Sequence, residues 1–350
     1  MAVSVVKFGV ALPWIFPKGG FKPETVTAAA KTCEESHWDS IWCGDHLLHL
    51  SGMEVPESWT LLTASATVTN KVRLGTCVTD PHRHHPAVLA QRLATIDHFS
   101  NGRVILGLGA GCSVNMDTFN IDWRNPVSKL EEYFQILKGL WGCEKFSHEG
   151  KHWSFKNAFL QIKPRQESIP IYFAANSPRT LGLTGKYADG WVPTGLTPSM
   201  YRKRLSVVRE TARKAGRNPD DIDAGIYLGV CLADSAEKAK AMLGLYKTLL
   251  SPGTLVEAGY KIDFPEELRE YSYVDWKPTP EYMNTLVEYM KLVPDEALSD
   301  FFVLGTADDC AEKIDEFIEA GVKHFVMDAV AEDYSKFVRD FGQVLSAVRD

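Results

Sequence analysis

The chain has 350 residues, 45% of them hydrophobic, which is enough to bury one large core or two ordinary ones. Its 38 Lys and Arg against 45 Asp and Glu give a formal net charge of −7, so it lacks the basic balance expected of a nucleic-acid-binding protein. The seven cysteines form no CxxC pair, which predicts reduced thiols in a cytoplasmic protein. The N-terminus has no basic stretch followed by an apolar one, and no uncharged apolar run reaches about 18 residues, so no membrane contact is expected.

Short β-rich runs alternate with longer segments of helical periodicity, an order typical of βα units and a parallel sheet. The expected strands are residues 7–12, 40–43, 72–78, 104–108, 169–174, 190–192, 222–231 and 323–329. The expected helices are residues 23–36, 59–68, 87–99, 126–141, 179–187, 200–215, 236–250 and 307–320. This alternation predicts an α/β fold, a closed (β/α)8 TIM barrel.

Two stretches depart from the βα repeat. Residues 146–164, which contain GKHWSF, precede the fifth strand, and the partly helical residues 251–299 precede the eighth. Long insertions in a barrel often form lids or interface elements. Because no flexible linker or internal repeat interrupts the chain, residues 1–350 are expected to form a single domain with insertions at about 145–165 and 251–299.

The second strand is followed by Asp45 and His46. Catalytic groups of a (β/α)8 barrel lie at the C-terminal ends of its strands, so both side chains should emerge at the barrel mouth. A histidine there could exchange a proton near neutral pH. The sequence leaves a second interpretation open, in which Asp45 caps a turn and His46 packs beneath the loop.

The third strand leads into a polar loop that contains His82, His84 and His85. Three histidines so close together could suggest zinc, but no regular element fixes their geometry and no Cys or carboxylate spacing accompanies them. The sequence therefore predicts no metal site. The loop is expected to border an anionic ligand.

The fourth strand is followed by Gly109, Gly111 and Cys112. The glycines match a dinucleotide fingerprint only superficially, since they follow the fourth strand and no acidic residue is placed to bind a ribose. We expect Gly109 and Gly111 to let a planar ring or a phosphate approach the backbone, with Cys112, Ser113 and Asn115 presenting side chains to it.

The fifth strand is followed by Asn176, Ser177 and Pro178. Ser177 as N-cap and Pro178 at the first helical position predict a helix start whose backbone N–H groups could receive a phosphate. An ordinary capped helix without a ligand is the alternative.

Four segments carry a family resemblance: IWCGDHL, LGTCVTDPHRHHPAVLAQRLATIDHFSNGRVILGLGAG, IYFAANSPRTLGLTGKYADGW and LGTADDCAEKIDEFIEAGVKHFVM. They are similar to the bacterial-luciferase-like flavin and deazaflavin oxidoreductases. The chain most resembles the branch that uses the deazaflavin coenzyme F420, which includes secondary-alcohol and glucose-6-phosphate dehydrogenases, methylenetetrahydromethanopterin reductase and phthiodiolone ketoreductase. The resemblance covers nearly the whole chain and is weakest over residues 251–299.

The resemblance implies roles for residues that follow the second, third, fourth and fifth strands. His46 matches the active-site histidine, and Cys77 and Val78 match a bulge with a non-prolyl cis peptide that supports the back face of the deazaflavin. The implied cofactor contacts are Asp45, Asp80 and Asn115, with Asn176, Ser177, Arg179 and Thr180 at the loop and helix start that receive the cofactor phosphate.

Two residues depart from the family pattern. Cys112 stands where the sugar and alcohol dehydrogenases have a catalytic glutamate, and Leu50 stands where they have a tryptophan. A thiol is a poorer proton shuttle than a carboxylate unless its pKa is lowered, so Cys112 either takes part in the chemistry or only shapes the pocket.

The resemblance implies an oxidoreductase that transfers a hydride between coenzyme F420 and a small or medium organic substrate, by reduction of a carbonyl, imine or alkene or by oxidation of an alcohol. His46 is the expected proton carrier, and a homodimer is the expected assembly. One alternative is an FMN-dependent luciferase-like monooxygenase. Another is a non-catalytic cofactor-binding subunit, an interpretation that Cys112 favours and His46 opposes.

Overall fold

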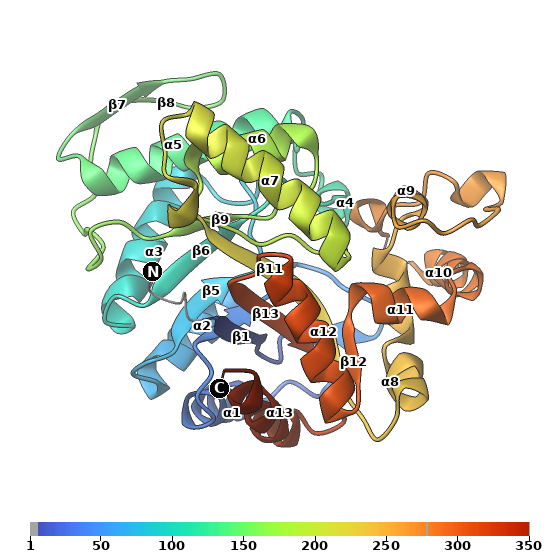
Figure 1. The fold of residues 1–350 in the computed structure, drawn as a ribbon. Coiled ribbons are helices and arrows are strands. Elements are labelled where there is room, and N and C mark those ends of the chain that lie inside the picture. Colours follow the sequence, from blue (N-terminus) through green and yellow to red (C-terminus); the bar gives the residue numbers. More distant parts are fainter. Residues whose placement is uncertain (1–5, 278, 350) are drawn as a thin grey trace.

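The computed structural model describes residues 6–277 and 279–349, and its centre is a closed barrel of parallel strands (Figure 1). Each strand pairs with the next in the chain, β10 pairs with β11, and β13 pairs with β1 to close the ring. The strands are β1 (Lys7–Ala11), β3 (Ser40–Cys43), β5 (Arg73–Thr76), β6 (Val104–Leu108), β9 (Ile171–Phe173), β10 (Gly190–Trp191), β11 (Asp223–Leu232) and β13 (His324–Ala329). The predicted barrel and its strands are confirmed.

Helices surround the barrel on its outside (Figure 1). They are α1 (Pro23–Glu35), α2 (Ser58–Val68), α3 (Pro86–Phe99), α5 (Pro126–Gly142), α6 (Pro178–Tyr187), α7 (Pro198–Lys214), α12 (Ala307–Glu319) and α13 (Tyr334–Arg349). The helix expected over residues 236–250 is instead α8 (Ala236–Met242) followed by a 3₁₀ turn, η3 (Gly244–Leu249). Gly244 lies at this break, where its low helix propensity favours interruption. Among the described residues, no helix has the length and apolar content needed to cross a membrane.

The barrel interior is filled by side chains that point inward from several strands. Trp42, Ile105, Tyr172, Val192 and Val326 form this inner cluster, and Cys77, Val78 and Tyr227 pack against it. Gly75 makes room for the Trp42 ring, because a Cβ at this position would lie 2.4 Å from Trp42 Cε3. The lower part of the barrel is therefore solid, and access is limited to the strand ends.

The two insertions have different structures. Residues 146–164 contain an antiparallel hairpin of β7 (Phe146–Glu149) and β8 (Ser154–Ala158). Residues 251–299 contain α9 (Pro252–Glu257), η4 (Glu266–Leu268), η5 (Tyr273–Asp275) and α10 (Pro280–Leu292), with α11 (Asp295–Phe301) at their end. A further strand, β12 (Val303–Gly305), pairs with the end of β11. In Figure 1, α8 to α11 gather at one side of the barrel.

The remaining short elements complete the chain. β2 (Phe16–Pro17) pairs with β4 (Met53–Glu54) in a small antiparallel ribbon. The loop after β6 contains α4 (Ser113–Met116) and η1 (Asp117–Phe119), and η2 (Pro219–Asp221) precedes β11.

Candidate active site

The C-terminal ends of β3, β5 and β6 bring the predicted site residues together. The Cys77 N–H donates to the Cys43 carbonyl at 2.9 Å, and the Cys77–Val78 peptide bond that follows is cis. After this bulge, Thr79 pairs with Leu108 of β6. The cis peptide implied by the family resemblance is confirmed, and it lies at the barrel mouth between β3 and β6.

Gly109 and Gly111 each have a structural role within the chain. A Cβ at Gly109 would lie 2.7 Å from Val78 Cγ2, so Gly109 makes room for the residue that follows the cis peptide. Gly111 has a φ of +96°, which favours glycine. A direct role of either glycine in cofactor approach stays a prediction.

Asp45 and Asp80 share one arginine that sequence reasoning missed. Arg83 Nη2 lies 2.7 Å from Asp45 Oδ2, and Arg83 Nε lies 2.5 Å from Asp80 Oδ2. The side chain of Arg83 is only 6% exposed, and those of Asp45 and Asp80 are 5% and 4% exposed. Burial opposes the charge of Arg83, but the two carboxylates outweigh burial and raise its pKa. This ion cluster fixes the loops after β3 and β5 relative to each other.

His46 lies beside this cluster and against aromatic rings. Its ring centroid is 5.5 Å from that of Trp14, which follows β1, and 6.1 Å from that of His49. Burial lowers the pKa of His46 to about 4, with a further contribution from Arg83. His46 is therefore a neutral imidazole at physiological pH.

Asn115 connects His46 to Cys112. Its Oδ1 accepts a hydrogen bond from the Leu47 N–H at 2.8 Å, and its Nδ2 lies 3.3 Å from His46 Nδ1 and 3.4 Å from Cys112 Sγ. Burial raises the pKa of Cys112 to about 11, so its thiol is protonated at neutral pH. Three predicted site residues thus form one hydrogen-bonded group.

The insertion of residues 251–299 reaches this group. Ser113 Oγ donates to the Trp276 carbonyl at 3.3 Å, and the Trp276 ring lies 5.2 Å from the His49 ring. Tyr273 of η5 also lies near Cys112. Burial is the main cause of the raised pKa of Tyr273, and the Cys112 thiol is the second cause. The insertion therefore supplies a wall of the site that the βα pattern did not reveal.

Across the mouth, the loop after β9 leads into α6. Ser177 caps this helix, and it forms the predicted N-cap as a capping box with Thr180. The box uses the backbone N–H groups of Ser177 and Thr180, and Pro178 has none. Fewer backbone N–H groups than predicted are therefore left to bind a phosphate at this helix start. Arg179 supplies the remaining backbone N–H of the turn, and its side chain is exposed.

Several buried polar atoms at this end have no hydrogen-bond partner in the described part of the chain. They are Thr79 Oγ1, Asn176 Oδ1, Thr194 Oγ1 and His49 Nδ1. Buried polar groups are nearly always satisfied, so these atoms fit a polar ligand that would complete their hydrogen bonds. Thr79 and Thr194 were missed from the sequence, because an isolated threonine has no distinctive local pattern.

The three neighbouring histidines have separate structural contacts. His82 Nε2 lies 2.9 Å from the Ala110 carbonyl, His84 Nε2 lies 3.4 Å from Arg92, and His85 Nδ1 accepts from the Ala87 N–H at the start of α3. Among residues 6–277 and 279–349, no group of three His, Cys, Asp or Glu side chains is arranged to hold a metal ion.

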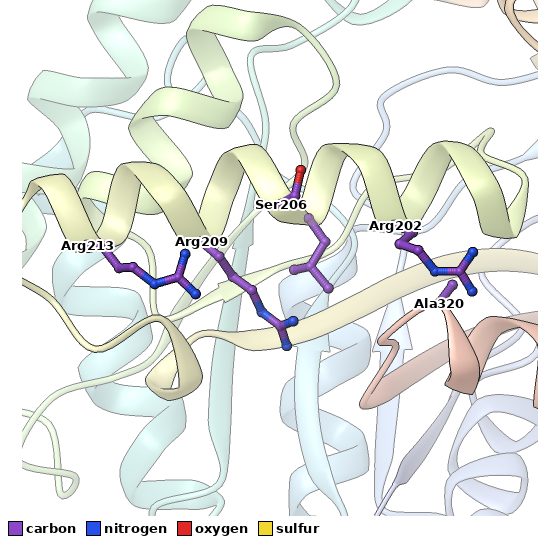
Figure 2. Close-up of a pocket in the computed structure, with 6 residues that line it drawn as sticks. Arg202, Ser206, Arg209, Arg213 and Ala320 are labelled. Carbon is purple, nitrogen blue, oxygen red and sulfur yellow. The ribbon is translucent and has the colours of Figure 1, made fainter.

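A separate cavity of about 250 Å³ lies on the outer surface, where Arg202, Arg209 and Arg213 project from one side of α7 and Ala320, at the end of α12, lies near Arg202 (Figure 2). None of the predicted site residues lines it. The cavity is therefore separate from the strand ends and is not part of the candidate active site.

Comparison with known proteins gives a consistent family. A family model described as luciferase-like monooxygenase matches residues 6–324. A phthiodiolone/phenolphthiodiolone dimycocerosates ketoreductase of Mycobacterium kansasii is 31% identical over 317 residues, which are 83% of this chain and 86% of that protein. An F420-dependent glucose-6-phosphate dehydrogenase of Microbacterium testaceum is 29% identical over 92% of both chains. The structure of an F420-dependent secondary alcohol dehydrogenase in complex with an F420-acetone adduct superposes with a TM-score of 0.85 at 24% identity, over 99% of this chain and 100% of that one.

Proposed function

The chain belongs to the luciferase-like monooxygenase family, and we propose that it is an oxidoreductase that transfers a hydride between coenzyme F420 and a small or medium organic substrate. Relatives named as F420-dependent or as reductases match more than four fifths of the chain, which supports this assignment over an FMN-dependent monooxygenase. The observation that carries the proposal in this chain is the combination of the cis Cys77–Val78 peptide with a neutral His46 at the same strand ends.

The residues at the mouth fit such a cofactor. When bound, F420 supplies or accepts a hydride at C5 of its deazaflavin ring. Cys77 and Val78 would support the ring, and the unpartnered oxygens of Asn176 and Thr194 would accept from its polar groups or tail. The helix start at Ser177, Arg179 and Thr180 would bind the phosphate.

His46 would donate a hydrogen bond to the substrate oxygen at which hydride transfer builds up negative charge, and the proton that completes the reduction would come from solvent. A neutral imidazole offers one N–H donor and one acceptor nitrogen, and this form suits hydrogen bonding to a substrate oxygen on which charge develops. Trp14 and His49 pack against the His46 ring, Trp276 packs against His49, and these rings would limit the access of water to His46. Exclusion of water strengthens the electrostatic contribution of that hydrogen bond.

Asp45 and Asp80 would act mainly through Arg83. All four of their carboxylate oxygens already accept hydrogen bonds from Arg83 or from the backbone of His82 and Arg83. Holding the two loops in place preserves the geometry around His46. A direct contact of either carboxylate with the cofactor is a further prediction.

Calorimetry with the purified full chain tests the cofactor. We expect F420 to bind with micromolar or better affinity and FMN to bind more weakly. A preference for FMN of about tenfold or more, equivalent to about 1.4 kcal/mol, would overturn the proposal.

A variant links that binding to the predicted site. Thr194→Val keeps the side-chain shape but removes the unpartnered hydroxyl, so it should weaken F420 binding. Thr95→Val is the matched control, since Thr95 Oγ1 donates only to the Gln91 carbonyl within α3. Equal affinities of the two variants would remove Thr194 from the cofactor site.

We also propose that the protein is cytoplasmic, which the seven free cysteines support. A homodimer stays a prediction from the sequence, and light scattering of the purified protein tests it.

A further inference from the structure

Asn115 has an amide whose orientation is fixed by the backbone. The side chain is 3% exposed, and its Oδ1 accepts from the Leu47 N–H at 2.8 Å. A rotated amide would place its NH₂ group against that N–H, so that two donors would face each other. The oxygen therefore points to Leu47, and Nδ2 points to the other side.

The fixed amide determines which nitrogen of His46 carries the proton. Nδ2 of Asn115 lies 3.3 Å from His46 Nδ1 and can only donate. Nδ1 must then accept, which places the proton of the neutral ring on Nε2. We infer that Asn115 is a positioning residue that fixes the Nε2–H tautomer of His46 and also holds the Cys112 thiol, 3.4 Å away.

This tautomer narrows the substrate class, a step that rests on the proposed function. With Nδ1 engaged by Asn115, the nitrogen of His46 available to a substrate is a hydrogen-bond donor. A donor recognises a group that accepts, such as a carbonyl oxygen or an imine nitrogen, and stabilises negative charge that develops on it. An alcohol oxygen can also accept this hydrogen bond, but alcohol oxidation needs a base for the hydroxyl proton, which a protonated Nε2 does not offer, so the oxidised substrate, a ketone, aldehyde or imine, is favoured.

The groups facing His46 act on the same equilibrium. Burial and Arg83 lower the pKa of His46 to about 4, while Asp45, Asp80 and the Leu48 carbonyl act to raise it. His49 packs against the same ring, and its own pKa is lowered to about 4 by burial. The Leu48 carbonyl favours a proton on the ring nitrogen that faces it, so the tautomer has to be measured directly.

Nitrogen NMR of the full chain with ¹⁵N-labelled histidine measures the tautomer directly, without cofactor or substrate. The chain has 10 histidines, and a His46→Gln spectrum identifies the His46 signals. We expect a protonated Nε2 and an unprotonated Nδ1 at neutral pH. A protonated Nδ1 in the unaltered protein would overturn the inference, and this outcome does not depend on whether F420 is the cofactor.

Asn115→Asp tests the cause. A carboxylate at this position can accept from both the Leu47 N–H and a His46 Nδ1–H, so the proton should move to Nδ1 and the titration midpoint of His46 should rise. Asn120→Asp is the matched control, because Asn120 is exposed and its substitution adds the same negative charge as Asn115→Asp. If Asn115→Asp folds and leaves the tautomer on Nε2, Asn115 does not set it. If it fails to fold, Asn115→Ala should give a mixture of tautomers, and a pure Nε2–H form would contradict the inference.

Discussion

His324 and His46 lie at opposite ends of the same barrel and have opposite surroundings. His324, at the start of β13, is 2% exposed, with Nε2 2.9 Å from Ser40 Oγ and Nδ1 3.2 Å from Asp223 Oδ2. Asp223 also pairs with Lys7 at 2.9 Å. Although burial opposes it, the bonds from His324 and Lys7 lower the pKa of Asp223 well below its usual range. Every polar group of this cluster has a partner within the protein.

At the C-terminal ends of the strands, by contrast, some buried polar groups have no hydrogen-bond partner. His49 Nδ1, Thr79 Oγ1 and Asn176 Oδ1 are buried without a partner among the described residues. The contrast shows that a Ser-His-Asp arrangement is not by itself a catalytic site. The cluster of Ser40, His324 and Asp223 is closed by the packed barrel core, whereas the unpartnered polar atoms at the mouth fit a polar ligand. In (β/α)8 barrels, residues at the N-terminal ends of the strands contribute to stability, and residues at the C-terminal ends carry out the chemistry.

Exchange of each histidine for alanine separates the two roles most strongly. His46→Ala should reduce turnover on the order of 10²–10⁴-fold while leaving F420 affinity nearly unchanged. His324→Ala should instead lower the free energy of unfolding by about 1–3 kcal/mol, since it removes one buried hydrogen-bond partner from each of Ser40 and Asp223, with turnover preserved at low temperature. Steady-state kinetics and urea denaturation measure both. Retention of more than about half of the turnover by His46→Ala would remove its catalytic role.

Arg83 is the exception at the mouth, because the four carboxylate oxygens of its partners Asp45 and Asp80 all accept hydrogen bonds. Arg83→Met keeps most of the side-chain volume but leaves Asp45 and Asp80 buried without a counter-charge. The free energy of unfolding should fall by about 3–5 kcal/mol at neutral pH, as measured by denaturant titration. Arg92→Met is the control, since Arg92 is 32% exposed and lies 3.8 Å from Glu57. Similar losses in both variants would show that the cluster adds nothing specific.

The sequence predicted the barrel because each barrel strand is a short apolar run bounded by turn residues. It did not predict β12, whose three residues are too few for a periodic signal. At the site, position after a strand was enough to identify Asp45 and His46. The pairing of both carboxylates with Arg83 depends on the register between β3 and β5, and the wall at Trp276 depends on the path of an insertion. Neither is encoded in local spacing.

Asp328 offers a pH-dependent test at the mouth. It ends β13 and accepts a hydrogen bond from Tyr246, and burial raises its pKa despite the hydrogen bonds from Tyr246 and Tyr227. The native state therefore keeps this proton above about pH 4, where an unfolded carboxyl loses it, and stability falls as the pH rises through that window. Asn cannot ionise, so Asp328→Asn does not lose stability in this pH window. The melting temperature of the variant should therefore rise relative to that of the parent protein between pH 4 and the raised pKa of Asp328.

Asp315→Asn is the control for that titration, because Asp315 is exposed on α12. The difference in melting temperature between Asp328→Asn and the parent should grow with pH, while the difference for Asp315→Asn should stay flat. A flat curve for both variants would mean that Asp328 ionises in the native state as it does in the unfolded chain.

Cys112 should give the smallest effect, although it is the residue that most separates this chain from its dehydrogenase relatives. Burial holds its pKa at about 11, so the thiol is not a nucleophile at neutral pH, and Asn115 can donate to a serine hydroxyl as it does to Sγ. Cys112→Ser should therefore change turnover by less than about tenfold, equivalent to about 1.4 kcal/mol. Cys112→Glu should lower it further, since a carboxylate would add charge to the pocket.

The opposite outcome has a distinct signature. A working thiol would lose at least about two orders of magnitude in turnover on replacement by serine. It would also be inactivated by alkylation in a manner that bound F420 prevents. The alkylation is measured in a Cys143→Ser background, because Cys143 is the exposed cysteine and would otherwise react first. Slow alkylation of Cys112 with little change in turnover would make it a residue that shapes the pocket, so that His46, oriented by Asn115, is the hydrogen-bond donor to the substrate on that side of the mouth.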